Sequence, residues 1–155
     1  MVDIGSIETR SPRRIFHLLG QNGLGRAGNL LVREPYADSV CWSGYPPHKR
    51  DEYSGTMETA HEEVYHHRFR PETGFGARLA SQPDGSSQCF MTQHGDTFLL
   101  DKGYRPTVTS PGHEENIFTI PVGKTRRGLV QNFKEEHRHL MRGIPGIQDM
   151  VNKFN

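Results

Sequence analysis

The chain has 155 residues, enough for one domain, and its 19 Lys and Arg nearly balance its 18 Asp and Glu. A net charge of +1 removes the electrostatic basis for binding nucleic acid or an anionic membrane. No stretch reaches the ~18 consecutive apolar residues of a membrane-spanning helix, and the first residues lack the apolar region of a secretory signal. We therefore expect a cytoplasmic protein with no nucleic-acid or membrane partner.

Taken in chain order, residues 1–28 sustain neither a helical nor a strand period, so we expect an irregular lead-in there. Short stretches of alternating character follow, at 29–33, 39–43, 62–70, 76–80, 88–92, 97–100, 106–109, 116–122 and 128–131. Turn-forming residues separate them, and Asp84-Gly85 is a typical hairpin turn. Strands at this spacing predict an all-β antiparallel sandwich, jelly roll or small barrel.

Only one segment has helical character, at 133–142, where Phe133, His137, Leu140 and Met141 can share a face. Gly143 and Pro145 follow and should end this short C-terminal helix. We expect the helix to cover one end of the barrel. The predicted organisation is therefore a lead-in over 1–28, a single domain over 29–143 and an uncommitted tail over 144–155.

The stretch 62–69 carries titratable side chains on both of its faces. Alternation places Glu63, Tyr65, His67 and Phe69 on one face and the intervening residues on the other. If that first face looks into the barrel, the Glu63 carboxylate loses its hydration. Glu63 then needs a metal ion, a cation or several hydrogen-bond donors as its partner.

Two further segments present charged side chains beside turns. In SGYPPHKRD, at 43–51, two prolines fix the approach of a strand that delivers His48 and Arg50 to the same side. In GDTFLLDKGYRP, at 95–106, a short strand leads into a glycine-containing turn that presents Arg105. Together with 62–69, these segments resemble the motifs of the cupins.

The resemblance narrows to the 5-deoxy-glucuronate isomerases of inositol catabolism, which are related to 4-deoxy-L-threo-5-hexosulose-uronate ketol-isomerase. The matching motifs keep the family's order and are WSGYPPHKRD at 42–51, EEVY at 62–65, RF at 68–69, GFG at 74–76, GD at 95–96, KGYRP at 102–106 and SPG at 110–112. The resemblance implies a cupin jelly-roll antiparallel barrel. A family member carries two cupin modules, and this chain resembles the C-terminal one.

In that family a divalent metal, zinc, is held by three histidines and a glutamate. Carried over position by position, His48 and Glu63 match two of these ligands, whereas the other two positions are Arg50 and Arg105. A guanidinium has no lone pair to give and keeps its proton. A unit charge about 5 Å from a divalent ion costs roughly 7 kcal/mol at an effective dielectric of 20. The resemblance thus implies weak or absent zinc binding in this chain.

Two functional readings remain open. The first is an intramolecular oxidoreductase that converts 5-deoxy-glucuronate to 5-dehydro-2-deoxy-gluconate, with a metal on His48 and Glu63 and with Tyr65 and His67 as candidate bases. The second is a metal-free binding module or inactive relic. In it Arg50 and Arg105 either pair with Glu63 or bind the carboxylate of an acidic sugar, with Tyr65 beside them. In either case, the open strand edges of a lone cupin module predict a homo-oligomer.

Overall fold

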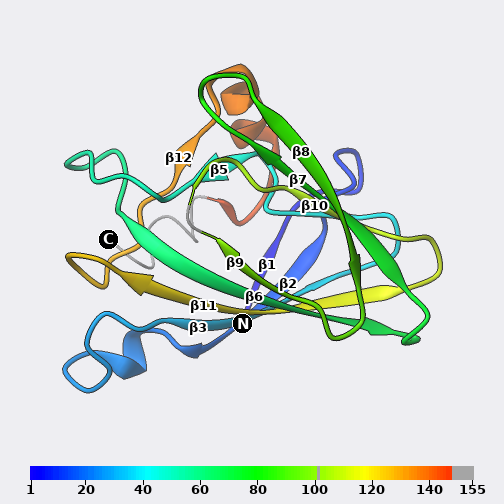
Figure 1. Cartoon of the computed structure of the whole chain (residues 1–155), viewed down its shortest axis with the longest axis horizontal. Coiled ribbons are helices and arrows are strands. Elements are labelled where there is room, and N and C mark those ends of the chain that lie inside the picture. Colours follow the sequence, from blue (N-terminus) through cyan, green and yellow to red (C-terminus); the bar gives the residue numbers. More distant parts are fainter. Residues whose placement is uncertain (101, 148–155) are drawn as a thin grey trace.

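Two antiparallel sheets form the frame of the computed structural model, which describes residues 1–100 and 102–147. The larger sheet has the order β1-β2-β3-β11-β6-β9, the smaller has the order β4-β10-β7-β8, and β12 pairs with β5 (Figure 1). The bounds in chain order are β1 Val2–Ile4, β2 Arg13–Leu19, β3 Val32–Ala37, β4 Trp42–Ser43, β5 His48–Lys49, β6 His61–Arg70, β7 Phe75–Ser81, β8 Ser87–Gln93, β9 Thr97–Leu100, β10 Thr107–Thr109, β11 Glu114–Gly123 and β12 Asn132–Phe133. This confirms the predicted all-β, cupin-like jelly roll.

The pairing of β6 with β11 is the longest in the described structure and runs antiparallel from His61↔Gly123 to Arg70↔Glu114. Along β6, buried Glu63, His67 and Phe69 alternate with exposed residues such as Glu62, which confirms the predicted alternation. The Asp84-Gly85 hairpin between β7 and β8 is also confirmed, and Gly85 has the positive φ of +87° that such a turn needs.

The expectation of an irregular lead-in over 1–28 is wrong, because β1 and β2 form one edge of the larger sheet. Along β2 the side chains of Arg13 and Ile15 are buried, whereas Phe16 and Leu18 are exposed. A buried arginine and exposed apolar residues reverse the usual pattern, which hid the strand period in the sequence. The domain therefore begins well before residue 29, and a short 3₁₀ turn, η1 (Gln21–Gly23), lies within the same region.

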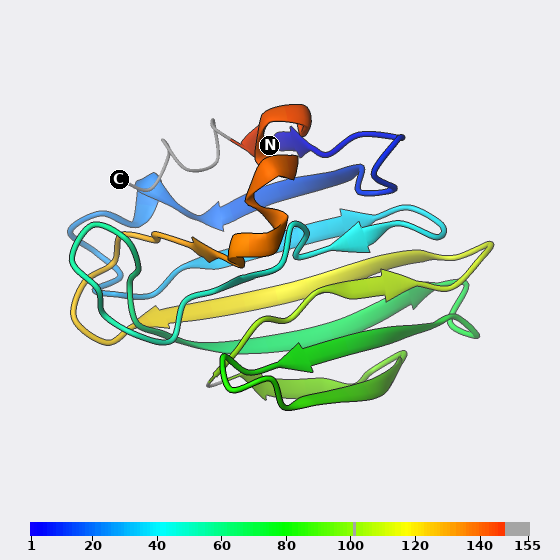
Figure 2. The ribbon, with the colours of Figure 1, turned by 90° about the horizontal axis from the view of Figure 1, so that it is seen from above.

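The C-terminal helix is present as η2, a 3₁₀ helix over Glu135–Gly143. Its Leu140 and Met141 pack against an apolar cluster of residues from both ends of the chain, namely Val2, Ile4, Ile15, Phe133, Ile144 and Ile147. Figure 2 shows η2 beside the N-terminal strands, and on its other side His137 lines a pocket together with Leu79 of β7 and Cys89 of β8. Residues 144–147 are therefore part of the packed domain rather than a tail, and 148–155 lie outside the described residues.

The strand expected at 128–131 is absent, and the chain there runs without regular structure into β12. No helix in residues 1–100 and 102–147 is long and apolar enough to cross a bilayer. The apolar cluster lies beside β1 and β2, and charged side chains are buried between the two sheets together with apolar ones such as Ile117. Arg33, Arg50, Glu63 and Arg105 are all buried there.

Candidate functional site

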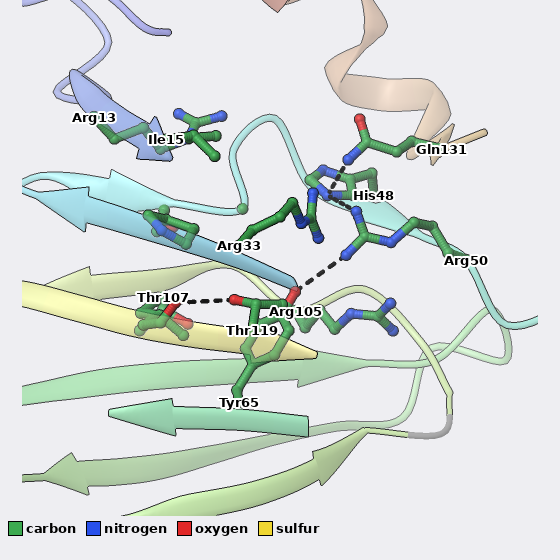
Figure 3. Close-up of a pocket in the computed structure, with 14 residues that line it drawn as sticks. Arg13, Ile15, Arg33, His48, Arg50, Tyr65, Arg105, Thr107, Thr119 and Gln131 are labelled. Atoms are coloured by element: carbon green, nitrogen blue, oxygen red, sulfur yellow. Dashed lines mark hydrogen bonds between the residues drawn. The ribbon is translucent and has the colours of Figure 1, made fainter. Parts of the chain in front are cut away.

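A small cavity lies inside the barrel between the two sheets. Arg13 and Ile15 from β2, Arg33 and Pro35 from β3, and Tyr65 from β6 line it on the side of the larger sheet. The other side is closed by His48 of β5 and the following Arg50, by Arg105 and Thr107 at the start of β10, and by Gln131 just before β12 (Figure 3). The cavity has a volume of about 40 Å³, which is room for a few water molecules.

Glu63 is fully buried and is bound by two arginines. Arg50 donates through Nε to Oε1 at 2.7 Å and through Nη2 to Oε2 at 2.6 Å, a two-pronged ion pair. Arg105 Nη2 also donates to Glu63 Oε1. Burial alone would raise the pKa of Glu63, but the charges of Arg105 and Arg50 hold it well below its usual range. The carboxylate therefore stays ionised at neutral pH.

His48 is neutral in this setting. Its Nδ1 lies 2.8 Å from the carbonyl oxygen of Pro46, which fixes the proton on Nδ1 and leaves the Nε2 lone pair free to accept. Gln131 Nε2 donates to His48 Nε2 at 3.0 Å, and Arg50 Nη1 lies 3.5 Å from the same atom. Burial, and then the charge of Arg50, holds the pKa of His48 well below its usual value.

Tyr65 lies at the floor of the cavity, where its hydroxyl accepts a hydrogen bond from Arg50 Nη2 at 3.1 Å (Figure 3). All five residues singled out from the sequence, His48, Arg50, Glu63, Tyr65 and Arg105, thus meet in one place. They meet as a network of hydrogen bonds and ion pairs centred on Arg50 and Glu63. This convergence does not by itself establish the expected roles of these residues as metal ligands or sugar-binding groups.

His67, the other candidate base, lies outside this cavity. Its Nδ1 is 2.7 Å from Glu115 Oε1, and Thr109 Oγ1 donates to the second oxygen of Glu115 at 2.9 Å. His67 and Glu115 are both fully buried. His67 therefore belongs to a separate buried network, and Tyr65 is the one of the two candidates that lines the cavity.

The residues at the expected ligand positions do not fit zinc. Both oxygens of Glu63 are taken by guanidinium groups, and Arg50 and Arg105 offer no lone pair. In the described part of the chain, no three His, Cys, Asp or Glu side chains come together in a group that could hold a metal ion. A catalytic zinc usually takes three ligands from the protein.

Sequence reasoning did not single out Arg13, Arg33 and Gln131, which also line the cavity. Arg13 lay in the segment expected to be irregular, and Gln131 lay at the end of a stretch expected to be a strand. Arg33 ended the alternating stretch at 29–33. A charged side chain on the inward face of a predicted strand is rarely buried without a partner, and this could have marked Arg33 as a site residue.

The fold and the cavity together define a cupin-like jelly-roll protein whose interior is occupied by arginines. A structure of oxalate decarboxylase from Lactobacillus farciminis has the same fold, with a TM-score of 0.51 over 78% of this chain at 12% identity. The similarity to a crystal structure of an IolB-like protein from Salmonella typhimurium is higher, with a TM-score of 0.79, 30% identity, and coverage of 84% of this chain and 49% of the other.

The chain belongs to the KduI/IolB family, whose model matches residues 1–140. Two curated relatives carry the name 5-deoxy-glucuronate isomerase. The one from Geobacillus thermodenitrificans is 33% identical over 83% of this chain, and the one from Shouchella clausii is 30% identical over 88%. The chain spans about half the length of these relatives, 45% and 51% respectively.

Proposed function

We propose that this chain binds the carboxylate of an acidic sugar in the arginine-lined cavity and that it does so without a metal ion. The observation that carries the proposal is the charge imbalance of the site. Among the described residues, four arginines line the cavity and no Asp or Glu does. Glu63, which lies behind Arg50 and Arg105, neutralises only one of the four positive charges.

Buried cations of like sign raise one another's free energy when their charge is not compensated. Burial, and then the charge of Arg33, lowers the pKa of Arg13 to about 10, because both disfavour its charged form. A carboxylate ligand would supply a compensating negative charge. The name of these relatives, 5-deoxy-glucuronate isomerase, refers to a sugar that carries a carboxylate.

The cavity is too small for a whole sugar, because about 40 Å³ accommodates only a few water molecules. The proposal is therefore that the carboxylate end enters and displaces water, while the rest of the ring occupies the mouth of the site. Gln131 and Arg13 both line the cavity wall.

The test is ligand binding by the metal-free chain, dialysed against EDTA, with isothermal titration calorimetry and thermal unfolding as readouts. D-glucuronate should bind and raise the unfolding temperature, whereas D-glucose, which has the same ring without the carboxylate, should do neither. Addition of zinc should leave the affinity unchanged. The absence of binding by D-glucuronate, D-galacturonate and 5-deoxy-glucuronate would overturn the proposal.

A second function, aldose to ketose isomerisation at the same site, is favoured by neutral His48 beside Arg50. His48 Nε2 would take a proton from the carbon next to the aldehyde, and the Arg50 guanidinium would stabilise the enediolate oxygen. Returning the proton to the aldehyde carbon, with the hydroxyl proton moving between the two oxygens, completes the isomerisation with no co-reactant.

Proton NMR of 5-deoxy-glucuronate in D₂O tests this function, since it detects both the ketose and deuterium incorporation. Turnover by the metal-free chain that is lost in His48→Gln, while D-glucuronate binding persists, would support it. Binding without turnover or exchange would leave the chain as a binding module.

A further inference from the structure

The four arginines of the cavity differ in how far the protein satisfies them. Arg50 donates to Glu63, Tyr65 and His48. Arg105 donates to Glu63 and to the carbonyl oxygen of Gly103. These two arginines are therefore already committed to partners within the protein.

Arg13 is committed in a different way. Its Nη1 donates to the carbonyl oxygen of Ser11 and its Nη2 to that of Tyr45, both at 2.9 Å. Both forks of this guanidinium are directed at backbone rather than at the cavity. Arg13 contributes charge to the site, but its donors are in use.

Arg33 is the exception. In the described part of the chain its guanidinium donates no hydrogen bond, and its Nε is buried without a partner. Its ion-pair contact is a distance of 3.9 Å from Nη2 to Glu63 Oε2, beyond hydrogen-bond range. The side chain is only 5% exposed and extends from β3 into the cavity toward His48 and Arg50 (Figure 3). Because Arg33 lines the cavity, a group that enters the cavity can supply the missing partners.

A buried guanidinium without partners is costly, because its lost hydration is not returned by hydrogen bonds or by an opposite charge. Burial, and then the charge of Arg50, lowers the pKa of Arg33 to about 10. Proteins retain such a group where a ligand supplies the missing partner. The planar fork of the guanidinium matches the two oxygens of a carboxylate.

We infer that Arg33 is the residue that receives the carboxylate of the bound acid through two parallel hydrogen bonds. The inference rests on the proposed function and deepens it. Arg50 and Arg105 were expected to bind the sugar. In this inference they instead hold Glu63 and so form the wall of the site. Their contacts with Glu63 persist when the ligand binds.

The test compares Arg33→Gln, Arg33→Lys and wild type by titration calorimetry with D-glucuronate. Loss of a charge-assisted, two-pronged contact should weaken the Kd of Arg33→Gln about tenfold to hundredfold. Arg33→Lys should fall between Arg33→Gln and wild type, since it keeps the charge but not the fork. Arg68→Gln, which removes a half-exposed arginine from β6, is the matched control and should bind as wild type does.

Folding does not confound this test, because removing an unpartnered buried cation should leave the unfolding temperature of Arg33→Gln unchanged or higher. Equal Kd values for wild type and Arg33→Gln would overturn the inference and leave the proposed function intact. A wild-type chain that binds none of the three sugar acids would overturn both.

Discussion

Glu63 is the residue on which the interior of this protein depends, because it compensates the positive charge of Arg50 and Arg105 at the centre of the barrel. A buried ion pair adds little net stability, yet removal of one partner leaves an uncompensated charge in a medium of low dielectric constant. The two arginines would face this cost together if the carboxylate were lost.

We therefore predict that Glu63→Gln lowers the free energy of unfolding by about 3–5 kcal/mol. Glu62→Gln is the control on the same strand, since Glu62 is 65% exposed and pairs with Lys124 at the surface. Its effect should be about 0–1 kcal/mol. Urea unfolding at neutral pH measures both, and equal effects of the two substitutions would contradict the prediction.

The pH dependence of stability follows from the same residue. The pKa of Glu63 is held well below its usual range in the folded state, so the unfolded chain takes up this proton first as pH falls. The contribution is complete above the unfolded pKa of about 4.3 and is lost as the pH falls toward the folded pKa. The charged groups that face the carboxylate are Arg33, Arg50 and Arg105, and their charges lower its pKa.

Urea unfolding between pH 7 and pH 3 should therefore show a steeper loss of stability below about pH 5 for wild type than for Glu63→Gln. Other carboxylates with lowered pKa values, such as Asp51, are present in both wild type and Glu63→Gln. Their effect therefore cancels when the two stability curves are subtracted. Parallel curves would show that Glu63 does not titrate as expected.

The arginines at positions 50 and 105 separate this chain from a metal-binding cupin. Arg50 and Arg105 both reach Glu63, and Arg50 also reaches His48, so the four side chains converge. We predict that Arg50→His combined with Arg105→His gains about one zinc ion per chain, since three imidazoles and a carboxylate match the preference of zinc.

Inductively coupled plasma mass spectrometry after gel filtration measures this gain. Arg14→His with Arg68→His, two half-exposed arginines, is the matched control and should gain none. If the double variant at 50 and 105 also remains free of zinc, the side chains do not converge as closely as a tetrahedral site requires.

At the scale of elements, β1 joins the two ends of the chain. Ile4 is 2% exposed in the apolar cluster with Ile144 and Ile147, and Gly5 N donates to the carbonyl oxygen of Pro145 at 3.1 Å. This cluster contains six of the buried apolar residues of the described structure and so supplies much of the apolar burial available to the fold.

Ile4→Ala should therefore lower the free energy of unfolding by about 2–5 kcal/mol, the usual cost of truncating a fully buried isoleucine. Ile7→Ala removes the same atoms from a residue that is 74% exposed and should cost less than about 0.5 kcal/mol. Chemical unfolding distinguishes the two. A small effect of Ile4→Ala would mean that the N-terminal strand contributes little to the folded state.

Several elements were predictable because their signals are local. The alternation of Glu63 and His67 with exposed residues gave the inward face of β6, and Asp84-Gly85 gave the turn between β7 and β8. Strands β1 and β2 were not predictable in the same way, since Arg13 points inward and Phe16 outward. The inward orientation of Arg13 is explained by the cavity that it lines, and the cavity is formed by the tertiary structure.

At the scale of the whole molecule, the outer face of β7 and β8 is apolar and open. Register pairs Ala77 with Met91 and Leu79 with Cys89 on this face, and Met91 and Leu79 are 61% and 37% exposed. Strand β8 is also the edge of its sheet. An open edge beside an apolar face favours pairing with another chain.

We expect a homo-oligomer in which a second copy covers this face, and light scattering after gel filtration should show a dimer at micromolar concentration. Leu79→Glu with Met91→Glu should shift it to the monomer, whereas Leu24→Glu, at a residue 65% exposed and outside the face, should not. A wild-type chain that stays monomeric at all concentrations would contradict this expectation.

The sequence by itself determined the β-rich jelly roll, the inward face of β6 and the identity of the residues that meet around Glu63. These follow from the two-residue strand period, from turn chemistry and from motif resemblance, all of which are readable locally. Only the tertiary structure decided how those residues are paired. Arg50 and Arg105, which are 13 and 42 positions from Glu63 in the sequence, both contact it, and within the described residues Arg33 Nε is left without a hydrogen-bond partner. The free energy of a buried charge depends on what surrounds it in space, and that surrounding is set by strands distant in the chain.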